Sequence, residues 1–391
     1  MTYLILLTFI LAPAYVIRFN FFHLPTDILM LWVFVVWIIF AVWLFAKKSV
    51  GDFFRFNFSI DKKILIPTCL FALAGLISLF VGGFDRAKLG QFIVWFLQPI
   101  SLFFIASYIF KKNPKSKDFL LLTLYFLLGL AGIYAILQYF TLLGLPSAWW
   151  GNSVEPKRAL SFFVHPNFYA LWSAPLLALL IPDVAESLKI EILNQKALLW
   201  LIGAAGLLLS LSRSGWLGLS VAVLVYLIFA ANNKIRKIIF GGIIIAALIV
   251  IAVPNLRWRV ILPFRGEKSA DSRIELWTDG ITAVKQSPIL GLGLTGFAKE
   301  YSTINIDPTL DTHNFPHNIF LNFWVETGLL GLISFLFIAY FGLYQGFKNR
   351  QDAIKLGVAL FLIAMLSQGL VDNPYFKNDL ALVFWIILSF I

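Results

Sequence analysis

Long apolar stretches separated by short polar connections dominate this sequence. About twelve can be placed, at residues 2–17, 27–46, 64–81, 89–110, 119–143, 165–181, 197–210, 214–231, 238–253, 318–344, 353–371 and 378–391. An α-helix that spans a bilayer needs about 20 predominantly apolar residues. The pattern therefore predicts an all-α polytopic membrane protein with about 12 transmembrane helices, forming a single integral membrane domain over residues 1–391.

Composition supports the class of membrane proteins and excludes a water-soluble protein. The chain is 60% hydrophobic and 13% charged, with a mean hydropathy of +0.87, which a water-soluble protein of this length would not have. In a soluble protein the net charge of +11 would suggest a nucleic-acid partner. Here the basic residues gather in loops, so we expect contact with membrane lipids and none with nucleic acid. Cys69 is the single cysteine, which excludes an internal disulfide and a cysteine-based metal site.

The basic residues also predict the orientation. Alternate connections are rich in lysine and arginine, for example at 47–48, 111–117 and 234–237, and cytoplasmic loops carry such residues in excess. We therefore expect both termini in the cytoplasm. Joining 197–210 and 214–231 into one helix would place the 234–237 cluster outside, so we expect two helices there. No basic region precedes the first stretch, which predicts a transmembrane helix and not a cleaved signal peptide.

The segment 254–316 is the longest polar connection, and this orientation places it outside the cytoplasm, between the ninth and tenth helices. Apolar Ile274, Trp277, Ile281 and Val284 recur with helical spacing, which predicts an amphipathic helix near 272–287, close to the outer membrane surface. A capping box, formed by the residues at 272 and 275, would begin this helix.

"GLGLTG", at 291–296, matches the glycine fingerprint of dinucleotide-binding folds. That fingerprint requires a preceding strand and a following helix. Here it follows a predicted helix, so we interpret it as a flexible turn that reorients the chain.

Arginines on the predicted outer side are candidates for binding an anion. Arg213 lies in "SLSRSGW" after a short apolar stretch, which could place it below the membrane surface. Arg273 would occupy the first turn of the predicted loop helix, where free N–H groups also attract anions. Arg158 and His165 bracket the entrance to the sixth stretch, and His165 is more typical of a helix entry than of a catalyst. Each arginine has the alternative role of an interfacial anchor.

A histidine begins the tenth apolar stretch, "HNIFLNFWVETGLLG". Imidazole titrates near neutral pH, which suits His317 to general-base catalysis, although a capping role at the helix start is the alternative. Asn318, Asn322 and Glu326 recur every four residues and share one helix face. Polar residues within an apolar helix either bind neighbouring helices or serve function.

Three motifs resemble successive signatures of the O-antigen ligase and polymerase family: "SRSGWLGL", "SRIELWTDGITAVKQSPILGLGLTGF" and "HNIFLNFWVETGLLGL". The resemblance covers residues 158–391. It implies a fold like that of GT-C glycosyltransferases, with a large periplasmic loop before the last helices, in the bacterial inner membrane. It also implies an inverting transfer of a glycan from undecaprenyl diphosphate to an acceptor, such as lipid A-core or another cell-envelope hydroxyl, without a metal or other cofactor.

The resemblance also implies roles for individual residues. Arg213 and Arg273 would bind the diphosphate, and His317 would activate the acceptor hydroxyl. Arg158 and Asn167, in "KRALSFFVHPN", match a weaker family pattern and would contact substrate. Asn318, Asn322 and Glu326 would form the supporting, substrate-binding face.

Two alternatives stay open. A polymerase of O-antigen or exopolysaccharide would use the same donor and differ in its acceptor, so the motifs do not separate it from a ligase. A transporter of polysaccharide or lipid-linked sugar would show broken helices, ionisable residues at mid-span and two similar halves. The sequence has one deep carboxylate, Glu326, and no evident repeat. Asp307 and Asp311 are the loop residues that could in principle bind a metal.

Overall fold

The computed structural model describes residues 1–21, 24–58, 60–151, 156–190, 194–261, 268–301 and 315–391. Within these residues, seven helices or continuous helix pairs are long and apolar enough to cross a membrane. They are α2 (Ile28–Ala46), α4 (Lys62–Phe80), α5 (Arg86–Phe92) continued through the π-helical turn η2 (Ile93–Leu97) into α6 (Gln98–Lys112), α7 (Lys115–Thr141), α8 (Pro166–Ile190), α11 (Asn233–Ala252) and α15 (Ile319–Lys348).

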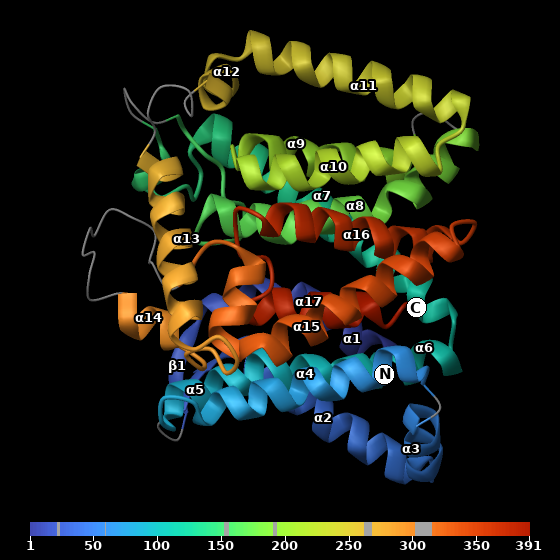
Figure 1. The fold of residues 1–391 in the computed structure, drawn as a ribbon. Coiled ribbons are helices and arrows are strands. Elements are labelled where there is room, and N and C mark those ends of the chain that lie inside the picture. Colours follow the sequence, from blue (N-terminus) through green and yellow to red (C-terminus); the bar gives the residue numbers. More distant parts are fainter. Residues whose placement is uncertain (22–23, 59, 152–155, 191–193, 262–267, 302–314) are drawn as a thin grey trace. The chain divides into compact units, whose positions relative to one another are not determined.

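Shorter helices occupy the other predicted stretches, so the helical membrane class is confirmed (Figure 1). These are α1 (Thr2–Ile10) with the 3₁₀ turn η1 (Ala12–Val16), α9 (Gln195–Leu209), α10 (Arg213–Phe229), α16 (Ala353–Gly369) and α17 (Asn378–Leu388). The separation of α9 from α10 agrees with the two helices predicted there. That about twelve helices cross the membrane stays a prediction.

Several elements lie in the connections. They are β1 (Arg18–Phe21), β2 (Leu24–Asp27), α3 (Val50–Phe58), η3 (Ser147–Trp149), α12 (Pro254–Ile261), α13 (Lys268–Gln286) and α14 (Gly296–Tyr301). The antiparallel hairpin β1–β2 was not predicted. It places Asp27 at the start of α2, where the carboxylate accepts a hydrogen bond from the Met30 N–H at 2.8 Å.

Contacts divide the chain into two compact units. Unit 1 comprises Met1–Leu120, Glu275–Tyr344 and Gly369–Ile391, and unit 2 comprises Leu121–Ile274 and Gln345–Gln368.

Aromatic side chains form much of the interior of unit 1. The ring of Phe71 lies 5.7 Å from that of Phe323 and 5.9 Å from that of Tyr375. The Tyr375 hydroxyl donates to the backbone oxygen of Trp95 at 2.6 Å and accepts from Trp385 Nε1 at 3.0 Å. These bonds fix the connection between α16 and α17, which carries the neighbouring residue Asp372.

Close contact between helix backbones characterises unit 2, where α8 packs beside α9 and α10 (Figure 1). A Cβ added at Gly132 of α7 would lie 2.3 Å from the Ile202 oxygen, and one at Gly357 of α16 would lie 2.2 Å from the Leu179 oxygen. Small residues allow this approach in membrane helices, because association there depends on van der Waals packing.

Helix α15 is interrupted at Gly328, which has φ 66° and ψ −173°. The break frees backbone groups that bind the segment after α13. Leu329 N donates to the Ile289 oxygen at 2.9 Å, and Leu292 N donates to the Val325 oxygen at 2.7 Å. The glycine turn at 291–296 is therefore docked against α15, between two helices and not in a βαβ unit.

The loop helix differs in detail from its prediction. Helix α13 begins at Lys268, so the residue at 272 lies inside it and the predicted capping box is wrong. The buried face carries Leu276, Ala283 and Val284, which pack with Phe297 and Val325, and Val284 belongs to the predicted apolar face. The other predicted residues Ile274 and Ile281 are 60% and 46% exposed, as a face turned to lipid would be, and that α13 lies at the membrane surface stays a prediction.

Candidate functional site

His317 lies directly before α15 in unit 1, with φ 45° in the left-handed region. Its Nδ1 is 3.3 Å from Oδ1 of Asp372, in the connection between α16 and α17. The Asp372 residue is 3% exposed, and the same oxygen accepts the Asn373 N–H at 2.9 Å. The structure thus pairs the predicted base with a carboxylate 55 residues further along the chain, which sequence reasoning missed.

This pairing determines which imidazole nitrogen can act as a base. An ionised carboxylate only accepts hydrogen bonds, so Nδ1 must donate to Asp372. In the neutral imidazole, Nε2 then holds the lone pair and can accept a proton. A His–carboxylate pair of this kind also stabilises the imidazolium that forms during proton transfer.

Hydrogen bonds from Asn318 and Trp277 hold His317 in place. Asn318 Oδ1 accepts the N–H groups of Phe320 and Leu321 at 3.0 and 3.1 Å, and so caps α15. Its Nδ2 donates to the Leu370 oxygen at 3.1 Å, which joins the His317 and Asp372 segments. Trp277 Nε1 of α13 donates to the His317 oxygen at 3.4 Å.

Asn322 and Glu326 are fully buried on α15. Glu326 Oε2 accepts the Thr295 N–H at 2.6 Å, so this carboxylate fastens the glycine turn. The side-chain amide of Asn322 has no hydrogen-bond partner within the described residues. In this structure, the polar stripe of α15 therefore serves the docking of the 288–296 segment through Glu326.

An ion pair secures the residues after the glycine turn. Lys299 Nζ of α14 lies 2.5 Å from Asp85 Oδ2, and Asp85 Oδ1 accepts the Lys88 N–H at the start of α5. The hydrogen bond from Lys299, assisted by the Lys88 N–H, lowers the pKa of Asp85 below its ordinary value.

The predicted residues Arg158, Asn167 and Arg213 lie in unit 2, near the turn between α9 and α10. Arg213 is the first residue of α10. Arg158 Nε donates to the Ser210 oxygen at 3.0 Å, and its Nη2 donates to Asn167 Oδ1 at 2.6 Å. The Arg158 guanidinium also lies over the Trp149 ring, 5.5 Å from its centroid. The structure thus joins Arg158 to Asn167 and to the turn that leads into Arg213.

A further arginine reaches the same turn. Arg259 of α12 donates from Nε to the Leu211 oxygen at 3.0 Å. Its signal in the sequence is weak, because "LRWR" offers two similar arginines and no pattern separates them.

Arg273 lies on α13, five residues after its start at Lys268. The prediction that Arg273 occupies the first turn of this helix is therefore wrong, because the preceding residues extend the helix. His165 lies directly before α8, and its Nδ1 accepts the Asn167 N–H at 3.0 Å, which agrees with the predicted helix-entry role.

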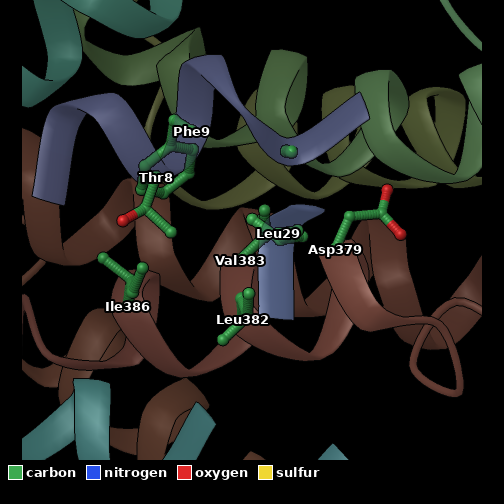
Figure 2. A pocket seen from close by; sticks show the side chains of 8 residues that line it. Thr8, Phe9, Leu29, Asp379, Leu382, Val383 and Ile386 are labelled. Carbon is green, nitrogen blue, oxygen red and sulfur yellow. The ribbon is translucent and has the colours of Figure 1, made fainter. Parts of the chain in front are cut away.

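A small pocket in unit 1 can be set aside as a substrate site. Thr8 and Phe9 of α1, Leu29 of α2, and Asp379 and Val383 of α17 contribute to its lining (Figure 2). The lining is mainly apolar and the empty volume is about 170 Å³. Ligand pockets commonly enclose about 300–1,000 Å³. A glycan or a diphosphate therefore does not fit its size or polarity.

Candidate metal ligands are not gathered in the part of the chain that the structure describes, where no group of three or more His, Cys, Asp or Glu is placed to hold an ion. Asp307 and Asp311 lie outside the described residues.

Taken together, these features define a helical membrane protein with a paired histidine and carboxylate in one unit and clustered arginines in the other. Residues 197–336 match the family model described as O-antigen ligase. This segment contains His317, Arg213 and Arg273. The match confirms the resemblance to the O-antigen ligase family, and that the similar region extends over residues 158–391 stays a prediction.

Curated relatives agree with this assignment. The chain is 27% identical over 225 residues to an O-antigen ligase of Pseudomonas aeruginosa, covering 56% of this chain and 49% of the relative. It is 28% identical over 162 residues to the exopolysaccharide production protein ExoQ of Rhizobium meliloti, covering 37% and 36%. An uncharacterized protein of Haemophilus influenzae is 26% identical over 160 residues, covering 36% and 40%. The matches span half or less of each relative's length.

Proposed function

We propose that this protein is a glycosyltransferase of the bacterial inner membrane. It moves a glycan from undecaprenyl diphosphate to a hydroxyl of an acceptor, such as lipid A-core or another component of the cell envelope, on the outer face of that membrane. The observation that carries the proposal is the His317–Asp372 pair, 3.3 Å apart, of which His317 lies inside the segment 197–336 that matches the family model.

His317 acts on the acceptor in this proposal. Its Nε2 takes the proton of the acceptor hydroxyl while the hydroxyl oxygen attacks the anomeric carbon of the donor. The bond from that carbon to the diphosphate oxygen breaks on the opposite face, which inverts the configuration. The proton is then held on His317 as an imidazolium, which the Asp372 carboxylate stabilises through Nδ1.

Arginines act on the leaving group. The departing lipid diphosphate gains negative charge, and guanidinium groups stabilise oxyanions through paired, charge-assisted hydrogen bonds. Arg213, at the start of α10, and Arg158, bound to the turn before it, are the described candidates, together with Arg273 of α13. Removing one such contact typically lowers the rate about 10²–10³-fold. This chemistry requires no metal.

The orientation in the membrane is part of the proposal. Both termini lie in the cytoplasm and the segment 254–316 lies outside, because the basic residues divide in that way. In this orientation the protein binds the donor diphosphate and the acceptor on the extracytoplasmic side.

A polymerase that uses the same donor is a second candidate. The likeness to an exopolysaccharide production protein favours it, since that relative is named for the production of a polysaccharide. The base and the leaving group would have the same roles, and the acceptor hydroxyl would belong to another glycan chain.

The test is a comparison of binding and turnover in His317→Gln. Glutamine keeps a polar side chain of similar reach but cannot accept a proton at this position. We expect purified His317→Gln to bind the lipid-linked donor like the wild type and to lose transfer by about 10²–10⁴-fold. His165→Gln is the matched control, because glutamine can still accept the Asn167 N–H, and it should transfer within a few-fold of the wild type. Wild-type turnover by His317→Gln would leave the histidine without a catalytic role.

A further inference from the structure

Two arginines from distant parts of unit 2 bind successive carbonyl oxygens of one turn. Arg158 Nε donates to the Ser210 oxygen and Arg259 Nε donates to the Leu211 oxygen, each at 3.0 Å. The turn joins α9 to α10, and Arg213 follows it directly. Two guanidinium groups therefore bind this turn, and a third arginine follows it in the chain.

The turn is a rigid platform for these groups. Ser210, Leu211 and Ser212 are buried, and Leu211 has φ 52° in the left-handed region. A residue other than glycine is strained in this region, so surrounding contacts must fix it. The bonds from Arg158 and Arg259 supply such contacts.

Contacts of helix α12 hold Arg259 close to the turn. Asn255 Nδ2, near its start, donates to the Tyr139 hydroxyl at 2.9 Å, and Leu256 is buried. Arg257, two residues before Arg259, is exposed and takes no part in this contact. The same short helix thus offers two arginines with different surroundings.

The hydrogen bond to the Leu211 oxygen places the Arg259 guanidinium at this turn and leaves its positive charge unchanged. A diphosphate linked to a lipid and a glycan carries two negative charges and several oxygens. It can engage more than one planar fork, whereas a monophosphate offers fewer oxygens.

We propose that Arg259 is a third arginine of the donor site, acting with Arg158 and Arg213 to select a polyprenyl diphosphate over a monophosphate. This inference rests on the proposed function and adds a residue outside the motifs. Arg259 acts both through its charge and as the tether of the Leu211 carbonyl.

Substitutions at Arg259 separate these two actions. Gln can keep the hydrogen bond to the Leu211 oxygen and removes the charge, whereas Lys keeps the charge and loses the planar fork. The full-length protein in nanodiscs is titrated with farnesyl diphosphate and farnesyl monophosphate at two ionic strengths. Arg257→Gln is the control with the same change in charge, and Arg213→Gln tests the proposed function.

We expect Arg259→Gln to weaken farnesyl diphosphate binding about tenfold, to weaken monophosphate binding less, and to reduce the salt dependence of binding. Arg259→Lys should recover part of the loss, and Arg257→Gln should bind like the wild type. If Arg259→Gln fails to fold, as judged by thermal unfolding, Arg259→Lys carries the comparison and should bind the diphosphate more weakly than the wild type.

Other outcomes are decisive as well. If Arg259→Gln binds like the wild type while Arg213→Gln loses binding, Arg259 is a structural tether and the inference fails, but the proposed function stands. If the wild type itself does not distinguish the diphosphate from the monophosphate, the proposed donor class fails, and the inference with it.

Discussion

Replacing Asp372 by asparagine tests the pairing that gives His317 its proposed role. The side chain keeps its shape, and its oxygen can still accept the Asn373 N–H. The negative charge beside Nδ1 is lost, while the same oxygen, held by the Asn373 N–H, can still accept from Nδ1–H, so Nε2 keeps its lone pair. The substitution therefore removes the charge that stabilises the imidazolium and leaves the tautomer unchanged.

The size of the effect follows from the geometry. At the 3.3 Å separation, with an effective dielectric constant of about 20, an imidazolium and a carboxylate attract each other by about 5 kcal/mol. With about half of the charge developed in the transition state, about 2.5 kcal/mol is expressed, which corresponds to about 10²-fold in rate. In serine proteases the comparable change costs about 10⁴-fold. A smaller loss is expected here because strong charge-assisted bonds measure about 2.7–2.9 Å.

The assay measures turnover at saturating donor and acceptor, together with donor binding, for the purified Asp372→Asn protein. We expect turnover to fall about 10²-fold with donor binding unchanged. Asp52→Asn serves as the control, because its ion pair with Lys112 is 4.0 Å long and solvent-exposed, so it should have no effect. Turnover within twofold of the wild type, or a loss confined to donor binding, would refute the role assigned to Asp372.

Two further predictions concern stability. Gly328→Ala should destabilise the fold by several kcal/mol, because its Cβ would lie 2.3 Å from the Ile289 oxygen at a positive φ. Gly241→Ala on α11 has open space and should be neutral or slightly stabilising, and thermal unfolding of both compares them. Because its pKa is lowered, ionised Asp85 stabilises the fold at neutral pH, and this contribution is lost as the pH falls through the lowered pKa. Asp85→Asn should therefore unfold at a lower temperature than the wild type at neutral pH, and the difference should shrink in acid.

The helical class and the residue His317 could be predicted because both depend on local pattern. Apolar stretches of bilayer length predict helices whatever their partners, and the histidine stands at a recognisable helix start. Asp372 could not be predicted in this way. It lies in an ordinary connection after α16, and only the packing of Tyr375 with Trp95 and Trp385 brings that connection to the histidine.

Helix α13 of the loop shows another limit of prediction from the sequence. Its helical period was evident, and Val284 of the predicted apolar face is buried, but the burial of Leu276 and Ala283 against the protein was not predicted. In the structure the partner surface is the start of α15, which Gly280 approaches so closely that an added Cβ would lie 3.1 Å from Pro316. Ala283 is buried at this contact together with the larger Leu276 and Val284, whereas Ile274 and Ile281 are exposed. Hydrophobicity alone predicts burial against lipid or a deep core, and it does not predict close approach of two backbones.

The glycine turn and Glu326 show that a sequence motif can have a structural role. The pattern P-x-x-G-x-G followed by E-x-G resembles a functional signature, and glycines near an acidic residue suggest a ligand. The structure accounts for both halves through one contact surface, in which the break at Gly328 accepts the backbone of the 288–296 segment and Glu326 binds the Thr295 N–H. The same surface orders α13, whose Trp277 binds the His317 oxygen. The motif thus acts on the proposed chemistry by positioning the backbone that carries the base.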